Sequence, residues 1–333
     1  MNMKKWKEGI IASDHKKALP VLSFPCVQIM GITVEQLISN STLQAEGMKK
    51  IAERTDSLAS LSMMDLSVEA EAFGSEIFTS NDEVPTVKGR ILESEMDADR
   101  LKIPDMGSGR TGLYIKAIER AVTEITDRPV FGGVIGPFSL AGRLMDMSEI
   151  MANCYDEPDM VTKTLEKTSE FIVNYIHEFK NAGANGVVMA EPAAGLLSPG
   201  LVDEFSSRYI QNIVSRVKDD DFLFILHNCG PNTPLMLPSL ANIGADMYHF
   251  GDAVQMTQIL EGMPADTPVL GNISPAAQFR NGTPESIYAV TTELLKECSQ
   301  YHNFIISSGC DIPPMSPWEN IDSFFKAVKD FYS

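Results

Sequence analysis

A histidine and a cysteine stand two positions apart at the end of an apolar run in the middle of the sequence. Residues 222–226 are apolar, and His227, Asn228 and Cys229 follow them. In an extended strand, residues i and i+2 lie on one face, so His227 and Cys229 point the same way. Imidazole nitrogen and thiolate sulfur are preferred zinc ligands, and a catalytic zinc has three protein ligands and an open position. Cys310 lies too far along the chain for a compact zinc finger, but it is compatible with a site closed by tertiary structure.

The alternative is that these cysteines are ordinary core residues, since free cysteine is among the most buried residue types. The flanking residues favour a site, because Gly230 follows Cys229 and Gly309 precedes Cys310, as in loops at strand ends. The number and wide spacing of the cysteines do not indicate a disulfide framework. Three cysteines lack such flanks and are interpreted as packing residues: Cys26, Cys154 and Cys298.

The composition excludes several classes of partner. The chain of 333 residues has a formal net charge of −18 and a pI of about 4.7. Nucleic acids and anionic membranes are bound by clustered Lys and Arg, so we expect neither among the partners. The first 17 residues contain no apolar segment long enough for a signal peptide, and no run approaches the ~20 apolar residues of a membrane span. We therefore expect a cytoplasmic protein, and we leave open whether it forms a homodimer.

Eight short apolar runs alternate with segments of helical periodicity. The runs cover residues 21–28, 58–66, 130–138, 185–192, 222–230, 245–252, 268–275 and 304–314. Each is almost continuously apolar, which is typical of strands buried on both faces of a parallel sheet. Helical spacing appears over 33–54, 159–182, 199–217, 284–298 and 317–332. This pattern predicts an α/β fold, a single (β/α)8 TIM barrel domain over residues 1–333.

The long polar stretch 67–110 interrupts the alternation after the second predicted strand. We interpret it as an insertion with a short hairpin and a helix over the barrel mouth. In a barrel of this type the chemistry lies at the carboxyl ends of the strands. Polar residues occupy those predicted ends: Gln28, Asp65, Glu191, His227, Asn228, Cys229, His249, Asp252, Asn272 and Cys310.

These strand-end residues receive provisional roles. Glu191 is the first candidate for the fourth position of a metal and Asp252 the second, because both end strands that neighbour the strand of His227. Asn228 and Asp252 are expected to orient the ligands. The remaining three are expected to lie behind the ligands or against the substrate: His249, Asp65 and Gln28.

Four segments together resemble the uroporphyrinogen decarboxylase superfamily: residues 62–77, 227–230, 269–275 and 307–321. The paired His-x-Cys and Gly-Cys-x-x-Pro-Pro elements are similar to its cobamide-dependent methyltransferase branch. The resemblance implies a (β/α)8 barrel with Zn²⁺ held by His227, Cys229 and Cys310. It also implies a methylcobamide:thiol (coenzyme M-like) methyltransferase. In that branch the zinc activates a thiol or similar acceptor, which takes a methyl group from a methylated corrinoid (cobamide) on a separate corrinoid protein.

Two other functions stay open. A uroporphyrinogen decarboxylase-type enzyme needs cations for the carboxylates of its tetrapyrrole, and the region 20–31, where the resemblance places an arginine-rich element, contains no arginine. A catalytically silent corrinoid-binding partner would not need an intact metal site. Small residues at the end of the third predicted strand, Gly132, Gly133 and Gly136, predict a wide mouth for a flat macrocycle. The alternative is that these glycines only serve tight turns.

Overall fold

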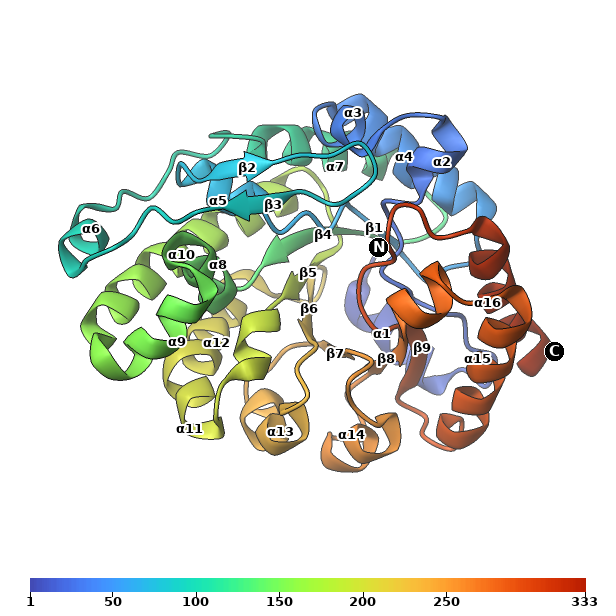
Figure 1. Cartoon of the computed structure of the whole chain (residues 1–333). Coiled ribbons are helices and arrows are strands. Elements are labelled where there is room, and N and C mark those ends of the chain that lie inside the picture. Colours follow the sequence, from blue (N-terminus) through green and yellow to red (C-terminus); the bar gives the residue numbers. More distant parts are fainter.

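The fold is built around one parallel sheet that curls around its own interior (Figure 1). The computed structural model describes residues 1–333. The strands of this sheet, in spatial order, are β1 (Ser60–Leu61), β4 (Val130–Ile135), β5 (Gly186–Ala190), β6 (Leu223–Asn228), β7 (Met247–Phe250), β8 (Val269–Ile273) and β9 (Phe304–Ser308). From β4 to β9, neighbours in the sheet are also consecutive in the chain. Each parallel pair therefore needs a crossover connection, and helices provide it.

The helices lie outside the curled sheet, as Figure 1 shows. The connecting helices are α7 (Thr111–Glu124), α8 (Pro137–Met145), α9 (Met147–Asp156), α10 (Pro158–Asn181), α11 (Pro199–Val202), α12 (Arg208–Val217), α13 (Thr233–Ala241), α14 (Met256–Gly262) and α15 (Pro284–Cys298). The terminal helices are α1 (Met3–Ala12), α2 (Cys26–Met30), α3 (Val34–Ile38), α4 (Ser41–Arg54) and α16 (Trp318–Phe331). A 3-10 helix covers Pro192–Leu196, and π-helical turns cover Asp203–Ser207 and Pro275–Arg280. The five helical predictions are confirmed, with the first divided into α3 and α4.

The first predicted strand, residues 21–28, is wrong. Residues 21–25 form a buried loop, and residues 26–28 are the first turn of α2, which follows Pro25. Proline lacks the backbone N–H that a central strand must donate, so Pro25 does not suit a strand at this point. An apolar run indicates that a segment is buried, but it does not distinguish a buried loop from a buried strand.

An extended segment just before that loop bridges the two outer strands of the sheet. Leu19 N donates to the carbonyl of Ile306 in β9 at 3.1 Å, and Leu58 N, ahead of β1, donates to Ala18 O at 2.9 Å. The sheet therefore has seven regular strands rather than the predicted eight. Residues 18–19 join its outer strands through one backbone hydrogen bond on each side.

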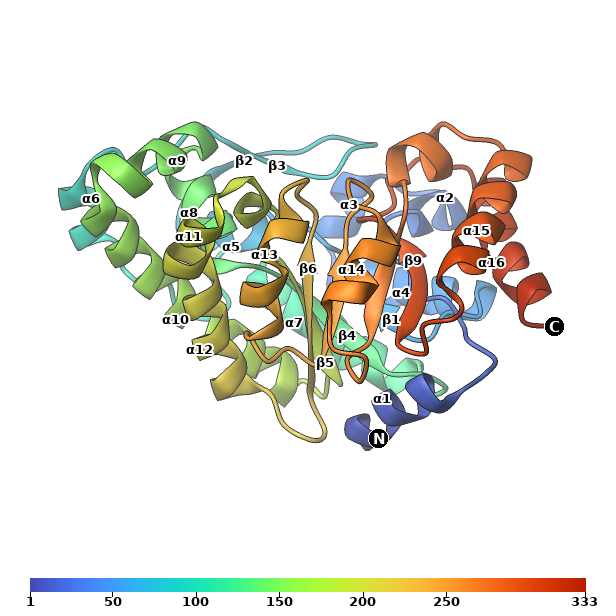
Figure 2. The same cartoon turned by 90° about the horizontal axis from the view of Figure 1, so that it is seen from below.

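The stretch 67–110 contains the predicted hairpin and helix. The antiparallel hairpin is β2 (Glu76–Phe78) and β3 (Thr86–Lys88), and it is flanked by α5 (Val68–Ala72) and α6 (Glu95–Arg100). In Figure 2 the hairpin lies at the opposite end of the sheet from α1. Helix α1 is tied to the amino end of β6, because Lys4 N donates to Asp220 O at 3.0 Å. The hairpin is thus remote from the amino ends of the strands.

Side chains of the strands alternate between the outer helices and the interior of the curled sheet. On β6, Phe224 and Leu226 belong to the large core cluster under the helices, whereas Leu223 and Ile225 belong to a separate, smaller cluster. Met3 of α1 joins this smaller cluster. The curled sheet therefore has a packed apolar interior, closed at its amino end by α1. None of the helices combines the length and apolar character that a membrane crossing requires.

Candidate metal centre

A layer of polar side chains lies on the interior face of the sheet, directly beyond its apolar layer. Residues two positions apart on a strand share a face. The interior residues Ile225, Met247 and Ile305 are each followed, two positions later, by a polar residue: His227, His249 and Ser307. Their side chains are 3%, 2% and 0% exposed. On β6, β7 and β9, the interior face thus turns from apolar to polar at the same level.

A chain of hydrogen bonds fixes the tautomer of His227. Burial, with a smaller effect from His227, holds the pKa of His249 well below its ordinary range, so that ring is neutral and has one N–H. Ser307 Oγ donates to the carbonyl of Leu19 at 2.7 Å, so it must accept from His249 Nε2, 2.8 Å away. His249 Nδ1 then accepts from His227 Nδ1 at 2.6 Å. His227 Nε2 therefore has a free lone pair, and it is buried without a hydrogen-bond partner.

Two thiols lie beside this imidazole. Cys229 follows β6 and Cys310 follows β9, yet the two side chains interact. The hydrogen bond from Cys310 stabilises a thiolate on Cys229 and so lowers the pKa of Cys229. The same hydrogen bond, together with burial, raises the pKa of Cys310 to about 12. His227 lies close enough to oppose that rise, although its Nε2 makes no hydrogen bond of normal geometry to either sulfur. Both thiols are partly exposed, whereas the other three cysteines are buried.

Asn228 supports the turn that carries Cys229. Its Oδ1 accepts from Thr233 Oγ1 at 2.6 Å and from Gly230 N at 3.3 Å. Its backbone carbonyl accepts from Gly251 N, in the loop after β7, at 3.0 Å. The side chain is 2% exposed, so it acts within the protein and not on a ligand. Asn228 thereby fixes the position of the neighbouring thiol.

Glycines allow the loops of this region to pack against one another. A Cβ at position 251 would lie 2.5 Å from the Cβ of Cys229, and a Cβ at position 309 would lie 2.7 Å from the backbone N of Asp252. The exposed Asp252 carboxylate is near enough to Cys229 to raise the pKa of that thiol, against the stronger lowering by Cys310. Asp252 is thus brought to the cysteines by close loop packing.

The donor types fit a metal, although the side chains as they stand do not surround one. The unpartnered Nε2 of His227 is a buried acceptor, and such a group costs about 1–3 kcal/mol when nothing satisfies it. Ligation would satisfy it, with Cys229 and Cys310 as further donors. No group of three or more His, Cys, Asp or Glu side chains is already arranged to hold an ion. The fit therefore rests on the orphaned nitrogen and on the chemistry of its neighbours.

Glu191 is engaged elsewhere. Its carboxylate accepts hydrogen bonds from Phe138 N at 3.0 Å, Ser139 N at 2.6 Å and Ser139 Oγ, in the first turn of α8. Burial raises the pKa of Glu191 to about 7, and these hydrogen bonds oppose the rise. Oε1 accepts two of these hydrogen bonds and Oε2 accepts one, so Oε2 is the oxygen of Glu191 with remaining acceptor capacity.

Asp65 is saturated by protein groups. Its Oδ1 accepts from the backbone N and the Oγ of Ser67 at 3.0 and 2.6 Å, and its Oδ2 accepts from Tyr114 OH at 2.8 Å and from Arg110 Nη1. Arg110 Nε also donates to Glu71 at 2.7 Å. Each carboxylate oxygen of Asp65 thus already accepts two hydrogen bonds. Asp65 anchors the end of the stretch 67–110 to the residues after β1 rather than offering an oxygen to a substrate.

Glu69 and Arg143 are charged groups of this region that the sequence patterns did not single out. Glu69 is 1% exposed, with Oε1 accepting from Ile135 N at 2.9 Å and Oε2 buried without a partner. Arg143 is half-buried in α8 and feels the charges of Asp65 and Glu69 without forming an ion pair. The available signal for Arg143 was a cation in an otherwise apolar helix, whereas Glu69 lies in the polar stretch 67–110 and had no such signal. Arg143 is thus a cation without an ion-pair partner, whereas Arg110 is held by Asp65 and Glu71.

Gln28 lies on α2 and not at a strand end. Its Nε2 donates to Pro314 O and to Ser316 O, both at 2.8 Å. Gln28 therefore fastens α2 to the loop that follows Cys310. This contact supports the loop from outside, and the expected place at the end of a first strand is wrong because that strand is absent.

The glycines at the end of β4 make room for protein side chains. A Cβ at Gly132 would lie 2.8 Å from the ring of Phe179. A Cβ at Gly133 would collide with Met64 Sδ, and one at Gly136 would collide with the Glu191 carboxylate. The interpretation that these glycines open the mouth for a macrocycle is therefore wrong, because their empty positions are filled by packing.

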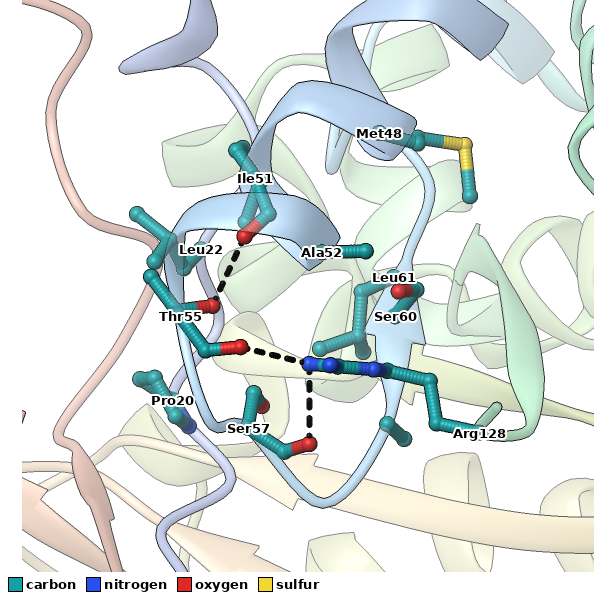
Figure 3. Close-up of a pocket in the computed structure, with 11 residues that line it drawn as sticks. Pro20, Leu22, Met48, Ile51, Ala52, Thr55, Ser57, Ser60, Leu61 and Arg128 are labelled. Atoms are coloured by element: carbon teal, nitrogen blue, oxygen red, sulfur yellow. Dashed lines mark hydrogen bonds between the residues drawn. The ribbon is translucent and has the colours of Figure 1, made fainter. Parts of the chain in front are cut away.

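A small, partly open pocket lies against β1 and α4, lined by none of the candidate ligands (Figure 3). Its volume is about 10 Å³, which is room for no more than one water molecule. Arg128 Nη1 donates to Thr55 O at 2.8 Å and to Ser57 O at 3.1 Å, as the dashed lines in Figure 3 show. Ser60 Oγ, which also lines the pocket, is buried without a partner. The pocket suits a structural water and not a substrate.

Comparisons with known proteins give the chain a family. The family model for uroporphyrinogen decarboxylase (URO-D) matches residues 21–331. The methylcobamide:CoM methyltransferase MtbA of Methanosarcina mazei is 26% identical over 339 residues, covering 98% of each chain. The uroporphyrinogen decarboxylase of Synechococcus sp. (strain CC9605) is 32% identical over 244 residues, covering 71% of this chain and 67% of its own. A solved structure described as a methyltransferase from Methanosarcina mazei shares the fold, with a TM-score of 0.89, 22% identity and 100% of both chains covered. The chain therefore belongs to the uroporphyrinogen decarboxylase family.

Proposed function

We propose that this protein is a zinc-dependent methyltransferase that moves a methyl group from a methylated corrinoid on a partner protein to a thiol. The observation that carries the proposal is the buried, unpartnered Nε2 of His227 beside two partly exposed thiols. The relative matched over 98% of both chains is named for a methylcobamide donor and the thiol CoM. A decarboxylase has no evident need for this histidine and cysteine set.

His227, Cys229 and Cys310 would hold the zinc. Asp252 is the candidate for the fourth position while no acceptor is bound, because its carboxylate is exposed and lies near Cys229. Glu191 becomes the weaker candidate, since its oxygens are held by α8. When bound, zinc lowers the pKa of the acceptor thiol so that it reacts as a thiolate at neutral pH.

The ligand set favours alkylation of a thiol over hydrolysis. Two cysteine thiolates and a neutral imidazole would balance the charge of a bound Zn²⁺, so a thiolate acceptor added to them would keep its negative charge and its nucleophilicity. Zinc sites that activate water more often have neutral histidines and stay cationic. The transfer forms a sulfur–carbon bond and breaks the carbon–cobalt bond, whose electron pair stays on the corrinoid cobalt.

The surrounding residues keep the ligands in place. The hydrogen bonds through His249 and Ser307 keep the proton on Nδ1 of His227 and off its Nε2. Asn228 holds the turn of Cys229. The acceptor and the corrinoid would approach the partly exposed thiols from the carboxyl ends of the strands, where active sites of this architecture lie.

Metal analysis of purified variants tests the site. We expect about one zinc per chain in the wild type and none in Cys310→Ala, because removing one of three protein ligands opens the site. Cys154→Ala is the matched control, since Cys154 is a buried cysteine away from the cluster. Circular dichroism should show both variants folded. Full zinc retention in Cys310→Ala would refute the assignment of Cys310 as a zinc ligand.

An activity assay separates this function from its alternatives. We expect methylcobalamin at high concentration to be demethylated in the presence of a suitable thiol, followed by the cobalamin spectrum, and His227→Ala to abolish the reaction. One observation favours a second candidate, decarboxylation of a uroporphyrinogen-type tetrapyrrole. Arg143 forms no ion pair and is available to a substrate carboxylate. Release of CO₂ from uroporphyrinogen, with no thiol methylated, would decide for the decarboxylase. Corrinoid binding without either reaction would indicate a non-catalytic corrinoid-binding protein.

A further inference from the structure

One side chain holds both ends of the loop that carries Asp252. Asn272, near the end of β8, donates from Nδ2 to Gly251 O at 2.9 Å and to Val254 O at 2.8 Å. An amide group has two N–H hydrogens, and this clamp uses both of them. The two carbonyls enclose Asp252 and Ala253, so the clamp fixes the backbone on each side of the Asp252 carboxylate.

Close packing confines the same loop from two further directions. A Cβ at Gly251 would lie 2.5 Å from the Cβ of Cys229, and one at Gly309 would lie 2.7 Å from the backbone N of Asp252. The loop therefore cannot move toward either cysteine-bearing loop without a collision. Since Asn272 also prevents it from moving away, the Asp252 backbone has one position relative to both thiols.

We propose that Asn272 is a positioning residue of the metal site, which acts by presenting the Asp252 carboxylate to the ion. The inference rests on the zinc site proposed above and adds a residue that contacts neither the metal nor the substrate. An exposed carboxylate on a free loop would sample many positions, and ordering it would cost conformational entropy at every binding event. A loop ordered in advance removes that cost, which strengthens ligation by Asp252 when no acceptor is bound.

Asn303 provides a matched control. Its Nδ2 also donates to two loop carbonyls, Pro264 O at 3.2 Å and Thr267 O at 2.9 Å, but it lies at the amino end of β9. Replacing Asn303 by alanine removes an equivalent pair of hydrogen bonds at the other end of the sheet. Any effect of lost hydrogen bonds on overall stability should appear in both variants.

The experiment measures the zinc dissociation constant by chelator competition on the full chain, with thermal unfolding recorded in parallel. We expect Asn272→Ala to weaken zinc binding by about 10- to 100-fold, the usual effect of losing a residue that orients a ligand. Asn303→Ala should lower the unfolding temperature by a similar amount and leave zinc affinity unchanged. In an Asp252→Ala background, Asn272→Ala should cause no further loss, because its effect passes through Asp252.

Three results would overturn the inference while leaving zinc binding by the protein intact. They are wild-type affinity in Asn272→Ala, unchanged affinity in Asp252→Ala, and losses that add when the two substitutions are combined. If Asn272→Ala fails to fold, Asn272→Ser serves instead, because serine is too short to reach both carbonyls and should show the same non-additive loss. A wild-type protein that binds no zinc would refute the proposed function itself, and with it this inference.

Discussion

Replacing Glu69 by glutamine should flatten the dependence of stability on pH. Glu69 is 1% exposed, and burial raises its pKa from 4.5 to about 7. The folded state thus holds this proton more tightly than the unfolded state does. The resulting stabilisation is complete below the unfolded pKa and is lost as the pH rises through about 7. At ~1.4 kcal/mol per unit, that shift corresponds to a loss of about 3 kcal/mol in the wild type.

Urea denaturation of the wild type and Glu69→Gln across this pH range measures the effect. Glutamine retains an oxygen that accepts from Ile135 N, but it cannot ionise. The free energy of unfolding of the variant, relative to the wild type, should therefore increase by about 3 kcal/mol between about pH 4 and pH 8. Glu46→Gln is the control, because Glu46 is exposed on α4 and should leave the wild-type pH profile unchanged. A constant difference between Glu69→Gln and wild type over the whole range would refute the reasoning from burial.

Ser307→Ala should weaken zinc binding by about 10- to 100-fold, because it removes the acceptor that fixes the tautomer of the ligating imidazole; chelator competition measures this loss. Asp65→Asn removes one of the two carboxylates that pair with the largely buried guanidinium of Arg110 and leaves Glu71 as its charged partner. Denaturant titration should show a loss of about 1.5–3 kcal/mol, the usual contribution of a hydrogen bond to a charged group. Gly136→Ala drives a methyl group into the Glu191 carboxylate and should cost about 1–3 kcal/mol of unfolding free energy, measured in the same way. An unchanged zinc affinity or an unchanged free energy of unfolding in any of these variants would contradict the contact on which its prediction rests.

The regular strands were predictable because their signal is local. The run 222–230 is apolar up to its histidine, and a glycine and a proline follow soon after. Strand β6 covers Leu223–Asn228 of this run. The run 21–28 is equally apolar but forms a loop and the start of α2. The two runs differ in backbone conformation because of Pro25 and because of contacts with distant residues. A pattern of hydrophobic residues reveals neither of these causes. Apolar content predicts burial well, and it predicts backbone conformation only where length and turn residues agree.

Residue types alone indicate which side chains could act as metal ligands, and strand periodicity predicts that His227 and Cys229 share a face because it follows from backbone geometry. The arrangement of hydrogen bonds behind these ligands depends on the three-dimensional fold. His227, His249, Ser307 and Leu19 form one chain of hydrogen bonds across separations of 22, 58 and 288 positions. Such bonds require donor and acceptor atoms within about 3 Å of each other. Strand periodicity in the sequence specifies which face of the strand a side chain is on, but it gives no distance to a residue on another strand. The free lone pair on His227 therefore exists because β6, β7, β9 and residues 18–19 meet around one curled sheet.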